Sequence, residues 1–206
     1  TDPNNPLRDI RVIPPGFVDS YESEPFHPEF LDRVSQFKVL RFMDLQSTNN
    51  SPLAHWPDRP LPTNATQASE RGVALEHLIA LANVLHADPW FCMPHQADDN
   101  YVQSFAEMVQ AQLDPDLRIY IEYSNEVWNS GFEQSGYAEA QGLQLGLSEN
   151  PFEARLRFYA RRATEAFAIW EGVFNENDRL VRVLGAQEAN PWAGTTIMAW
   201  EGASEH

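Results

Sequence analysis

The chain has 206 residues, of which 43% are apolar and 21% are charged, so its length and composition suit a globular protein with its own core. Its 30 acidic and 14 basic residues give a net charge of −16 at pH 7. So negative a surface repels nucleic acid phosphates and anionic membranes, which excludes both as expected partners and leaves neutral or cationic ones.

Short β-like runs alternate with helical patterns from the start of the chain. Arg8–Ile13 ends at a turn signal, Pro14–Gly16, and is predicted to be a strand. Apolar residues at helical spacing predict a helix over His27–Phe37, and Phe37–Met43 is the next predicted strand. Asp44–Ser69 is rich in Asn, Pro, Ser and Thr and is predicted to be a long loop, of a kind that is usually functional or disordered.

The same alternation continues to the other end of the chain. Helices are predicted over Val73–Leu85, Tyr101–Leu113, Gly131–Leu145, Pro151–Val173 and Pro191–Ala199. Strands are predicted over Ala87–Met93, Leu117–Tyr123 and Leu180–Leu184. Strands separated by helices of this length predict βα units and a parallel sheet.

Two architectures fit this pattern, a doubly wound sheet and a closed (β/α)₈ barrel. A Gly-rich phosphate-binding turn would favour the first, and the sequence has none. Polar residues follow the carboxyl ends of the predicted strands, where a barrel carries its active site. They are Arg41, Asp44, His95, Asn125, Glu126, Gln187, Glu188 and Asn190. We therefore predict an α/β protein, with residues 1–206 forming a single domain that is a partial TIM-type barrel.

The number of predicted strands is smaller than a complete barrel requires. About five βα units are predicted, whereas a barrel has eight. We therefore expect a fragment that holds the first βα units. Such a body would expose a sheet edge and an apolar face, and a homo-oligomer formed through the open edge would cover them.

One strand end carries residues suited to the cleavage of sugars. Glycoside hydrolysis normally uses two carboxyl groups, one to protonate the leaving oxygen and one as nucleophile or base. The acid must keep its proton near neutral pH, which requires partly apolar surroundings. Glu126 follows an apolar strand and is flanked by Val127 and Trp128, so it is the candidate acid. Asn125 can hydrogen-bond a sugar hydroxyl without adding charge.

The segment 125–129 (Asn-Glu-Val-Trp-Asn) resembles the fourth-strand motif of clan A glycoside hydrolases, which are (β/α)₈ barrels. The resemblance implies that Glu126 is the acid/base and that the nucleophile is a second Glu at the end of the seventh strand. Arg41 is placed like the clan's second-strand Arg, which hydrogen-bonds the nucleophile. His95 is placed like a substrate-contacting His at the end of the third strand. The run from residue 26 to residue 126 is also similar to cellulase-like bacterial proteins of this clan.

The resemblance implies a retaining hydrolase that acts on β-linked glycans. The seventh strand is missing from the predicted elements, so we expect the nucleophile to be missing too. Glu188 is a poor substitute, because its predicted strand neighbours that of Glu126 instead of facing it. The alternative function is a non-catalytic glycan-binding partial barrel that associates into a dimer. The predicted substrate-binding residues are Asn125, Arg41, His95, Trp128, Asp44 and Glu188.

Several of these residues also have purely structural interpretations. Glu126 could cap the helix that follows it. Arg41 could pair with Asp44 or with Glu122. Glu122 lies in mid-strand, so we predict that it forms a structural ion pair with an Arg and takes no part in catalysis.

No metal or cofactor is predicted. His95, Asp98 and Asp99 superficially resemble a metal cluster, but their spacing matches no well-defined ligand motif. The two aspartates precede a predicted helix, where capping its N-terminus is a sufficient role. Cys92 lies in an apolar run and is predicted to be a buried, unreactive thiol.

Tryptophan side chains are candidate platforms for sugar rings, because the flat indole face matches the C–H face of a pyranose. By its position Trp128 is the first candidate, and Trp56 in the long polar loop is the second. Trp90 and Trp170 are predicted to belong to the core.

The sequence contains no apolar run near the roughly 18 residues that a membrane-spanning helix needs. Residues 1–5 also lack the basic and apolar parts of a signal peptide. We expect a secreted or periplasmic protein whose signal has been removed, with a cytosolic protein as the alternative.

Overall fold

The computed structural model describes residues 2–8, 10–175, 178–201 and 203. Its residue contacts fall into two units, residues 1–36 and residues 37–206. The first unit contains helix α1 (Pro28–Val34), which confirms the predicted helix in this region. Pro28 suits the first turn of this helix because it lacks an N–H, and the imidazole Nδ1 of His27 accepts a hydrogen bond from the backbone N–H of Glu29 (3.2 Å).

The predicted strand over Arg8–Ile13 is wrong for the residues that the structure describes there, 8 and 10–13. The side chains of Ile10 and Val12 are 75% and 96% exposed. A strand needs a partner for its backbone groups and a covered face for its apolar side chains, and this segment gains neither. Residue 9 lies outside the described part of the chain.

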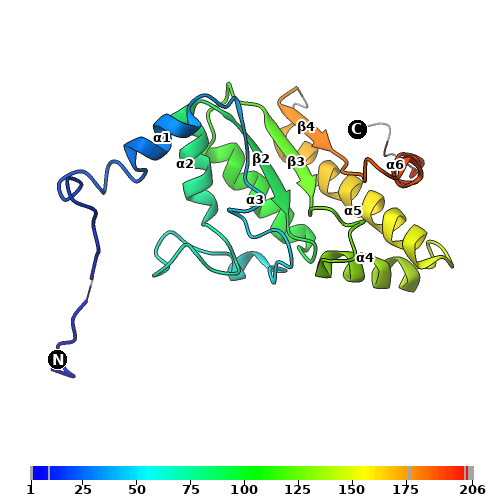
Figure 1. Cartoon of the computed structure of the whole chain (residues 1–206), viewed down its shortest axis with the longest axis horizontal. Coiled ribbons are helices and arrows are strands. Elements are labelled where there is room, and N and C mark those ends of the chain that lie inside the picture. The colour runs from blue at the N-terminus through cyan, green and yellow to red at the C-terminus, as the bar shows by residue number, and fades with distance from the viewer. Residues whose placement is uncertain (1, 9, 176–177, 202, 204–206) are drawn as a thin grey trace. The chain divides into compact units, whose positions relative to one another are not determined.

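The second unit is built on a four-stranded parallel sheet, which confirms the predicted α/β class (Figure 1). Its strands are β1 (Val39–Arg41), β2 (Asp88–Met93), β3 (Ile119–Tyr123) and β4 (Leu180–Val183). They lie side by side in the order in which they occur in the sequence. The described residues thus contain four strands where about five were expected, because the first predicted strand does not form.

Helices connect the successive strands of this unit. They are the short 3₁₀ helix η1 (Trp56–Asp58), α2 (Leu75–Leu85), α3 (Asp99–Gln112), α4 (Glu133–Gln144) and α5 (Pro151–Phe174), and a further helix, α6 (Pro191–Met198), follows β4. Parallel strands are joined almost always by right-handed crossovers, and here each crossover steps in the same direction along the sheet. Such connections bring their helices to one face of the sheet. Accordingly, α2 packs on β2 and α5 on β3, and α3 lies between α2 and α5.

The core lies between this helical layer and the sheet. The ring of Phe91 in β2 meets Phe105 of α3 edge to face and stacks on Trp170 of α5. Trp170, which is fully buried, also stacks on Phe174. These contacts confirm Trp170 as a core residue and fix the helices against the strands.

The opposite face of the sheet carries the side chains that alternate with this core. The strand register aligns Arg41, Trp90 and Tyr120 across β1, β2 and β3, and aligns Cys92 with Glu122 across β2 and β3. The indole of Trp90 stacks on the ring of Tyr120 (centroids 5.6 Å apart), and both residues stay half-buried. The sheet therefore has one face under helices and one aromatic face that is partly open, whereas parallel sheets are normally covered on both.

The search for membrane-spanning helices among the described residues found none of sufficient length and apolar character.

Candidate functional site

Arg41 links the first and third strands at the carboxyl end of the sheet. It is the last residue of β1, and its guanidinium reaches across β2. Nη2 donates hydrogen bonds to Oε2 of Glu122 (2.7 Å) and to Oδ1 of Asn125 (2.9 Å), and Nε donates to the same Glu122 oxygen (3.3 Å). The Glu122 side chain is 6% exposed and that of Arg41 is 33% exposed, so the pair joins a buried carboxylate to a partly exposed cation.

The Glu122 carboxylate is held by further donors. Oε2 also accepts from the indole Nε1 of Trp90 (2.9 Å) and lies 3.5 Å from the thiol of Cys92. Oε1 faces Gly185, where an added Cβ would lie only 3.2 Å away. Glu122 is therefore a structural anion, as predicted, and it is Glu122 that pairs with Arg41, while Asp44 lies exposed in the loop after β1.

The charges around Arg41 affect the pKa of its guanidinium. Burial lowers the pKa of Arg41, but the hydrogen bond and the negative charge of Glu122 outweigh that effect and raise it, with a further contribution from the charge of Glu126. The positive charge is thus retained at all accessible pH values. Burial also raises the pKa of Cys92 well above its usual value, which confirms Cys92 as a buried neutral thiol.

A chain of amide side chains holds Asn125 from the other side. Its Nδ2 donates to Oδ1 of Asn49 (3.0 Å), in the loop after β1. Nε2 of Gln134, a buried residue of α4, donates to the same Asn49 oxygen (2.7 Å) and to the backbone carbonyl of Asn125 (2.8 Å). Oε1 of Gln134 in turn accepts from the backbone N–H of Asn50 (3.0 Å). The long polar loop is thereby tied to both the strand end and α4.

Glu126 lies in a strained turn directly after β3. Glu126 and Ser124 have φ values of +41° and +61°, a left-handed conformation that non-glycine residues seldom adopt. The Glu126 carboxylate is half-buried and accepts from Nδ2 of Asn129 (2.9 Å). Helix α4 begins only at Glu133, whose N–H donates to Oδ1 of Asn50 (2.8 Å), so the interpretation of Glu126 as a helix cap is wrong. Strain of this kind is concentrated at functional sites.

We expect Glu126→Gly to be about 1 kcal/mol more stable than Glu126→Ala, since the left-handed conformation costs a residue with a Cβ about 1 kcal/mol or more. Both variants lack the carboxylate, so their difference isolates the backbone. Urea denaturation measures the free energies of unfolding. At the exposed Glu107, inside α3, the order should reverse, because Ala is about 1 kcal/mol better than Gly in a helix. An alanine variant at 126 that matched or exceeded the glycine one would show that the backbone there is unstrained.

His95 follows β2, but its side chain is not among those gathered around Arg41. It is buried, its ring meets Tyr137 of α4 edge to face (centroids 5.2 Å apart), and its Nδ1 has no hydrogen-bond partner among the described residues. Burial lowers the pKa of His95 to about 4, so the imidazole is neutral near pH 7. Tyr137 lines an open concavity together with Phe158 and Arg162. Any contact of His95 with a ligand would therefore involve an uncharged ring on the α4 side.

Like Asp44, neither Trp128 nor Glu188 forms a hydrogen bond or ion pair with Arg41 in the part of the chain that the structure describes. Trp128 is half-buried, and its carbonyl accepts from Nη1 of Arg155 in α5 (3.3 Å). The same guanidinium pairs with Glu139 of α4. Glu188 is exposed in the segment between β4 and α6.

The aspartates after His95 have structural roles. Asp98 caps α3 by accepting from the N–H of Tyr101 (2.7 Å), and its second oxygen pairs with His55 (2.7 Å). Asp99 pairs with Arg162 of α5 (2.7 Å). Among the described residues no group of His, Cys, Asp and Glu is arranged to hold a metal ion. The capping interpretation is confirmed for Asp98, whereas Asp99 is the first residue of α3 and forms an ion pair instead.

Sequence reasoning missed Trp90, Asn49 and Gln134. Trp90 was predicted to be core, yet it is half-buried on the sheet face of Arg41, whose guanidinium lies 5.0 Å from the indole centroid. The alternation of side chains along β2 contained that signal, because Trp90 points away from the buried Phe91. Asn49 and Gln134 gave no local signal. Asn49 contacts Asn125 and Gln134, which are 76 and 85 positions away along the chain.

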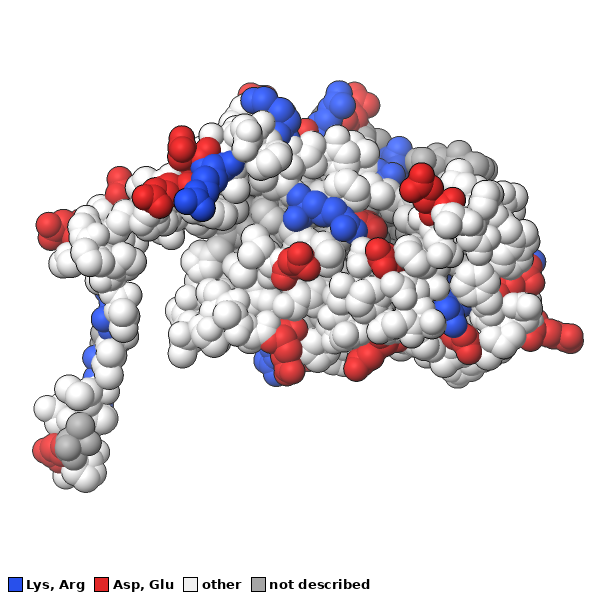
Figure 2. Space-filling model, viewed as in Figure 1, with Lys and Arg blue, Asp and Glu red and all other residues white. Residues whose placement is uncertain are grey.

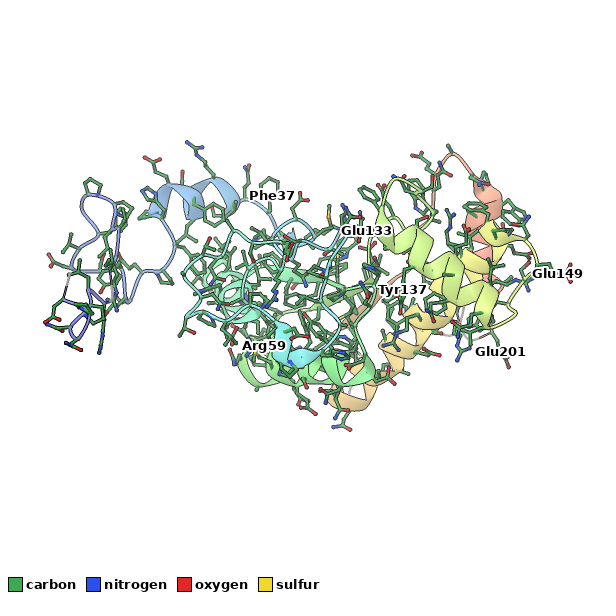
Figure 3. The ribbon with its side chains drawn as sticks, turned by 90° about the horizontal axis from the view of Figure 1, so that it is seen from below. Phe37, Arg59, Glu133, Tyr137, Glu149 and Glu201 are labelled. Carbon is green, nitrogen blue, oxygen red and sulfur yellow. The ribbon has the colours of Figure 1, made fainter. Side chains whose placement is uncertain are left out.

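Two views show the charged surface and the side chains of the second unit. In Figure 2, basic and acidic side chains meet in the middle of a largely uncharged surface, over the region of β2 and β3. Figure 3 shows Glu133 and Tyr137 along α4, and Glu149 at the outer end of the connection between α4 and α5. The ion pair of Arg41 and Glu122 is bordered by the amide of Asn125, which in turn contacts Asn49, and by the indole of Trp90.

Comparison with protein-family models, with curated proteins and with solved structures finds no significant match for this chain. Chemically, the arrangement offers a half-buried carboxyl group at Glu126, an amide at Asn125 and a neutralised cation at Arg41. Such a set is suited to hydrogen-bonding an uncharged polyhydroxyl ligand and to passing a proton to it.

Proposed function

We propose that this chain carries the acid/base half of a retaining glycoside hydrolase site for β-linked glycans, of the clan A type. The observation that carries the proposal is the bridge from Arg41 to Glu122 and Asn125 at the strand end immediately before the strained Glu126. Arg41 thus contacts Asn125, the first residue of the Asn-Glu pair, and both positions resemble residues of the clan motif. In this role Glu126 donates a proton to the leaving oxygen and later receives one from water.

The proposed architecture is part of a (β/α)₈ barrel. Its support is the sheet order, which runs from β1 to β4 without the reversal that creates the ligand crevice of doubly wound sheets. Helices gathered on one face and an aromatic second face also suit a barrel wall, whose inner face is filled with side chains from its strands. Trp90 and Tyr120 would then be interior residues below the mouth that holds Glu126.

The proposed substrate is an uncharged glycan. Glu122 already neutralises Arg41, so the site offers no free cation to attract an anionic ligand. The amide of Asn125 supplies a hydrogen-bond donor without adding charge. The net charge of −16 further disfavours acidic polysaccharides through long-range repulsion.

A second candidate is glycan binding without hydrolysis. Of the other candidate carboxylates, Glu188 is exposed in the segment after β4, and Glu122 is held by Arg41, Trp90 and Cys92. A carboxylate with so many donors is a weak nucleophile. The second carboxyl group of the proposed hydrolase would therefore have to come from outside the four described strands, and without it the site would bind a glycan and leave it intact.

The test compares Glu126→Gln with a matched control, Glu149→Gln, at an exposed loop position. With the second carboxyl group in place, the hydrolase proposal predicts that the wild type and the control hydrolyse aryl β-glycosides and soluble β-glucans, and that Glu126→Gln loses at least 100-fold in rate, about the lower bound for loss of a general acid. Equal rates for the two variants would rule out the acid/base role. Glycan binding by calorimetry without turnover, lost in Trp128→Ala, would favour the second candidate.

A further inference from the structure

The side-chain amides of Asn125, Asn49 and Gln134 form a series of hydrogen bonds. At both ends of this series the donor and acceptor roles are fixed. At one end, the Arg41 guanidinium can only donate, so the Asn125 atom that it contacts at 2.9 Å must be Oδ1. At the other end, Gln134 meets the N–H of Asn50 and the carbonyl of Asn125, which fixes its Oε1 and its Nε2 respectively. The orientation of each terminal amide is therefore set by a group that cannot reverse its role.

Asn49 joins these two ends. Its Oδ1 accepts from both Nδ2 of Asn125 (3.0 Å) and Nε2 of Gln134 (2.7 Å). Rotation of the Asn125 amide by half a turn would set its nitrogen against the Arg41 guanidinium and its oxygen against the Asn49 oxygen. Both contacts would become repulsive, so only one orientation satisfies the series.

We infer that Gln134, acting through Asn49, is a positioning residue that holds the Asn125 amide with one N–H free for a ligand oxygen. Asn125 gives one of its two N–H groups to Asn49, and its oxygen is engaged by Arg41. The second N–H of Asn125 has no partner among the hydrogen bonds found between described residues, and it would select a ligand that presents an acceptor, such as a sugar hydroxyl oxygen. This inference rests on the proposed function for the identity of the ligand but not for the locking of the amide.

Burial makes Gln134 effective in this role. Its side chain is inaccessible to solvent, so water cannot replace the two hydrogen bonds that its Nε2 donates. Gln134 is the second residue of α4, so its hydrogen bonds connect the Asn125 backbone and the Asn49 amide to the helix backbone. Loss of Gln134 should therefore free the Asn49 and Asn125 amides to rotate.

The test uses Gln134→Met, which keeps the side-chain length without the amide, and Gln144→Met, at an exposed position of the same helix, as control. Side-chain amide resonances of Asn125, assigned by their absence in Asn125→Asp, report hydrogen exchange by NMR. We expect exchange at Asn125 to become at least about 10-fold faster in Gln134→Met and to stay unchanged in the control, because a lost hydrogen bond of about 1.4 kcal/mol corresponds to a factor of ten. Asn49→Ser should give the same change without altering the buried helix face.

Hydrolysis or binding of a panel of singly deoxygenated glycosides supplies a second readout. Removal of one particular hydroxyl from the glycoside should lower its binding or hydrolysis by the wild-type chain about 10-fold. The same removal should hardly change binding or hydrolysis by Gln134→Met, because the fixed N–H is already lost in that variant. Unchanged amide exchange in both Gln134→Met and Asn49→Ser would overturn the inference. Faster exchange in a chain that neither binds nor cleaves glycans would uphold the positioning role while rejecting the proposed function.

Discussion

In a hydrolase whose second carboxyl group is in place, replacing Glu126 with alanine is expected to slow the hydrolysis of alkyl β-glycosides by about 1,000-fold, within the range known for general acids. Dinitrophenyl glycosides should lose far less, because a dinitrophenolate leaves without being protonated. The ratio of the two effects, measured as kcat/KM for the two substrates, isolates proton donation from general damage to the site. A uniform loss for both leaving groups would instead indicate that Glu126 acts only in binding.

Added azide provides the second half of this experiment. With an activated substrate, the alanine variant should be slowed in the later step, in which Glu126 would deprotonate water. Azide needs no general base, so it should restore turnover and yield a glycosyl azide of retained configuration. Trp128→Ala, which leaves the carboxyl group in place, should show no azide effect. An inverted product would contradict the retaining mechanism.

The order of helices and strands from residue 37 onward could be predicted because each element is long or strongly patterned. The stripe on α5 that includes Trp170 predicted a long helix, and the short apolar runs of β2 and β3 lie where expected. Arg8–Ile13 shows the limit of this reasoning. Its pattern is that of a strand, but whether a neighbouring strand is available to pair with it is a tertiary fact that local sequence does not contain.

The sequence predicted which backbone positions of the site lie together, because the carboxyl ends of parallel strands share one edge of the sheet. Arg41 and Asn125 end or follow parallel strands separated by one other strand, so the rule that carboxyl ends share an edge brings them together. His95 follows the strand between them, yet its side chain packs against Tyr137. Sequence position places the backbone of a residue at the edge, but the rotamer that it adopts depends on the helix packed beside it.

The ion pair of Arg41 and Glu122 connects stability to the site, because the same guanidinium holds Asn125. We expect Arg41→Met to lower the free energy of unfolding by about 3 kcal/mol, the lower end of the range for breaking a buried pair, since Arg41 is one-third exposed. The loss arises mainly because the buried Glu122 carboxylate would remain without a cation. Urea denaturation with a wild-type reference measures it.

A double-mutant cycle separates this cause from lost packing. Adding Glu122→Gln to Arg41→Met removes the unpaired charge, so the double variant should be more stable than Arg41→Met alone, by about 1 kcal/mol or more. The control is the helical pair of Arg161 and Glu165 on α5, whose side chains are 40% and 42% exposed, and Arg161→Met should cost less than about 0.5 kcal/mol. Two results would each show that Arg41 does not stabilise the charge of the buried Glu122 carboxylate. One is that Arg41→Met lowers the free energy of unfolding no more than Arg161→Met does, and the other is that Glu122→Gln lowers it further in the double variant. The strand-end cluster that presents Asn125 would then need another source of rigidity.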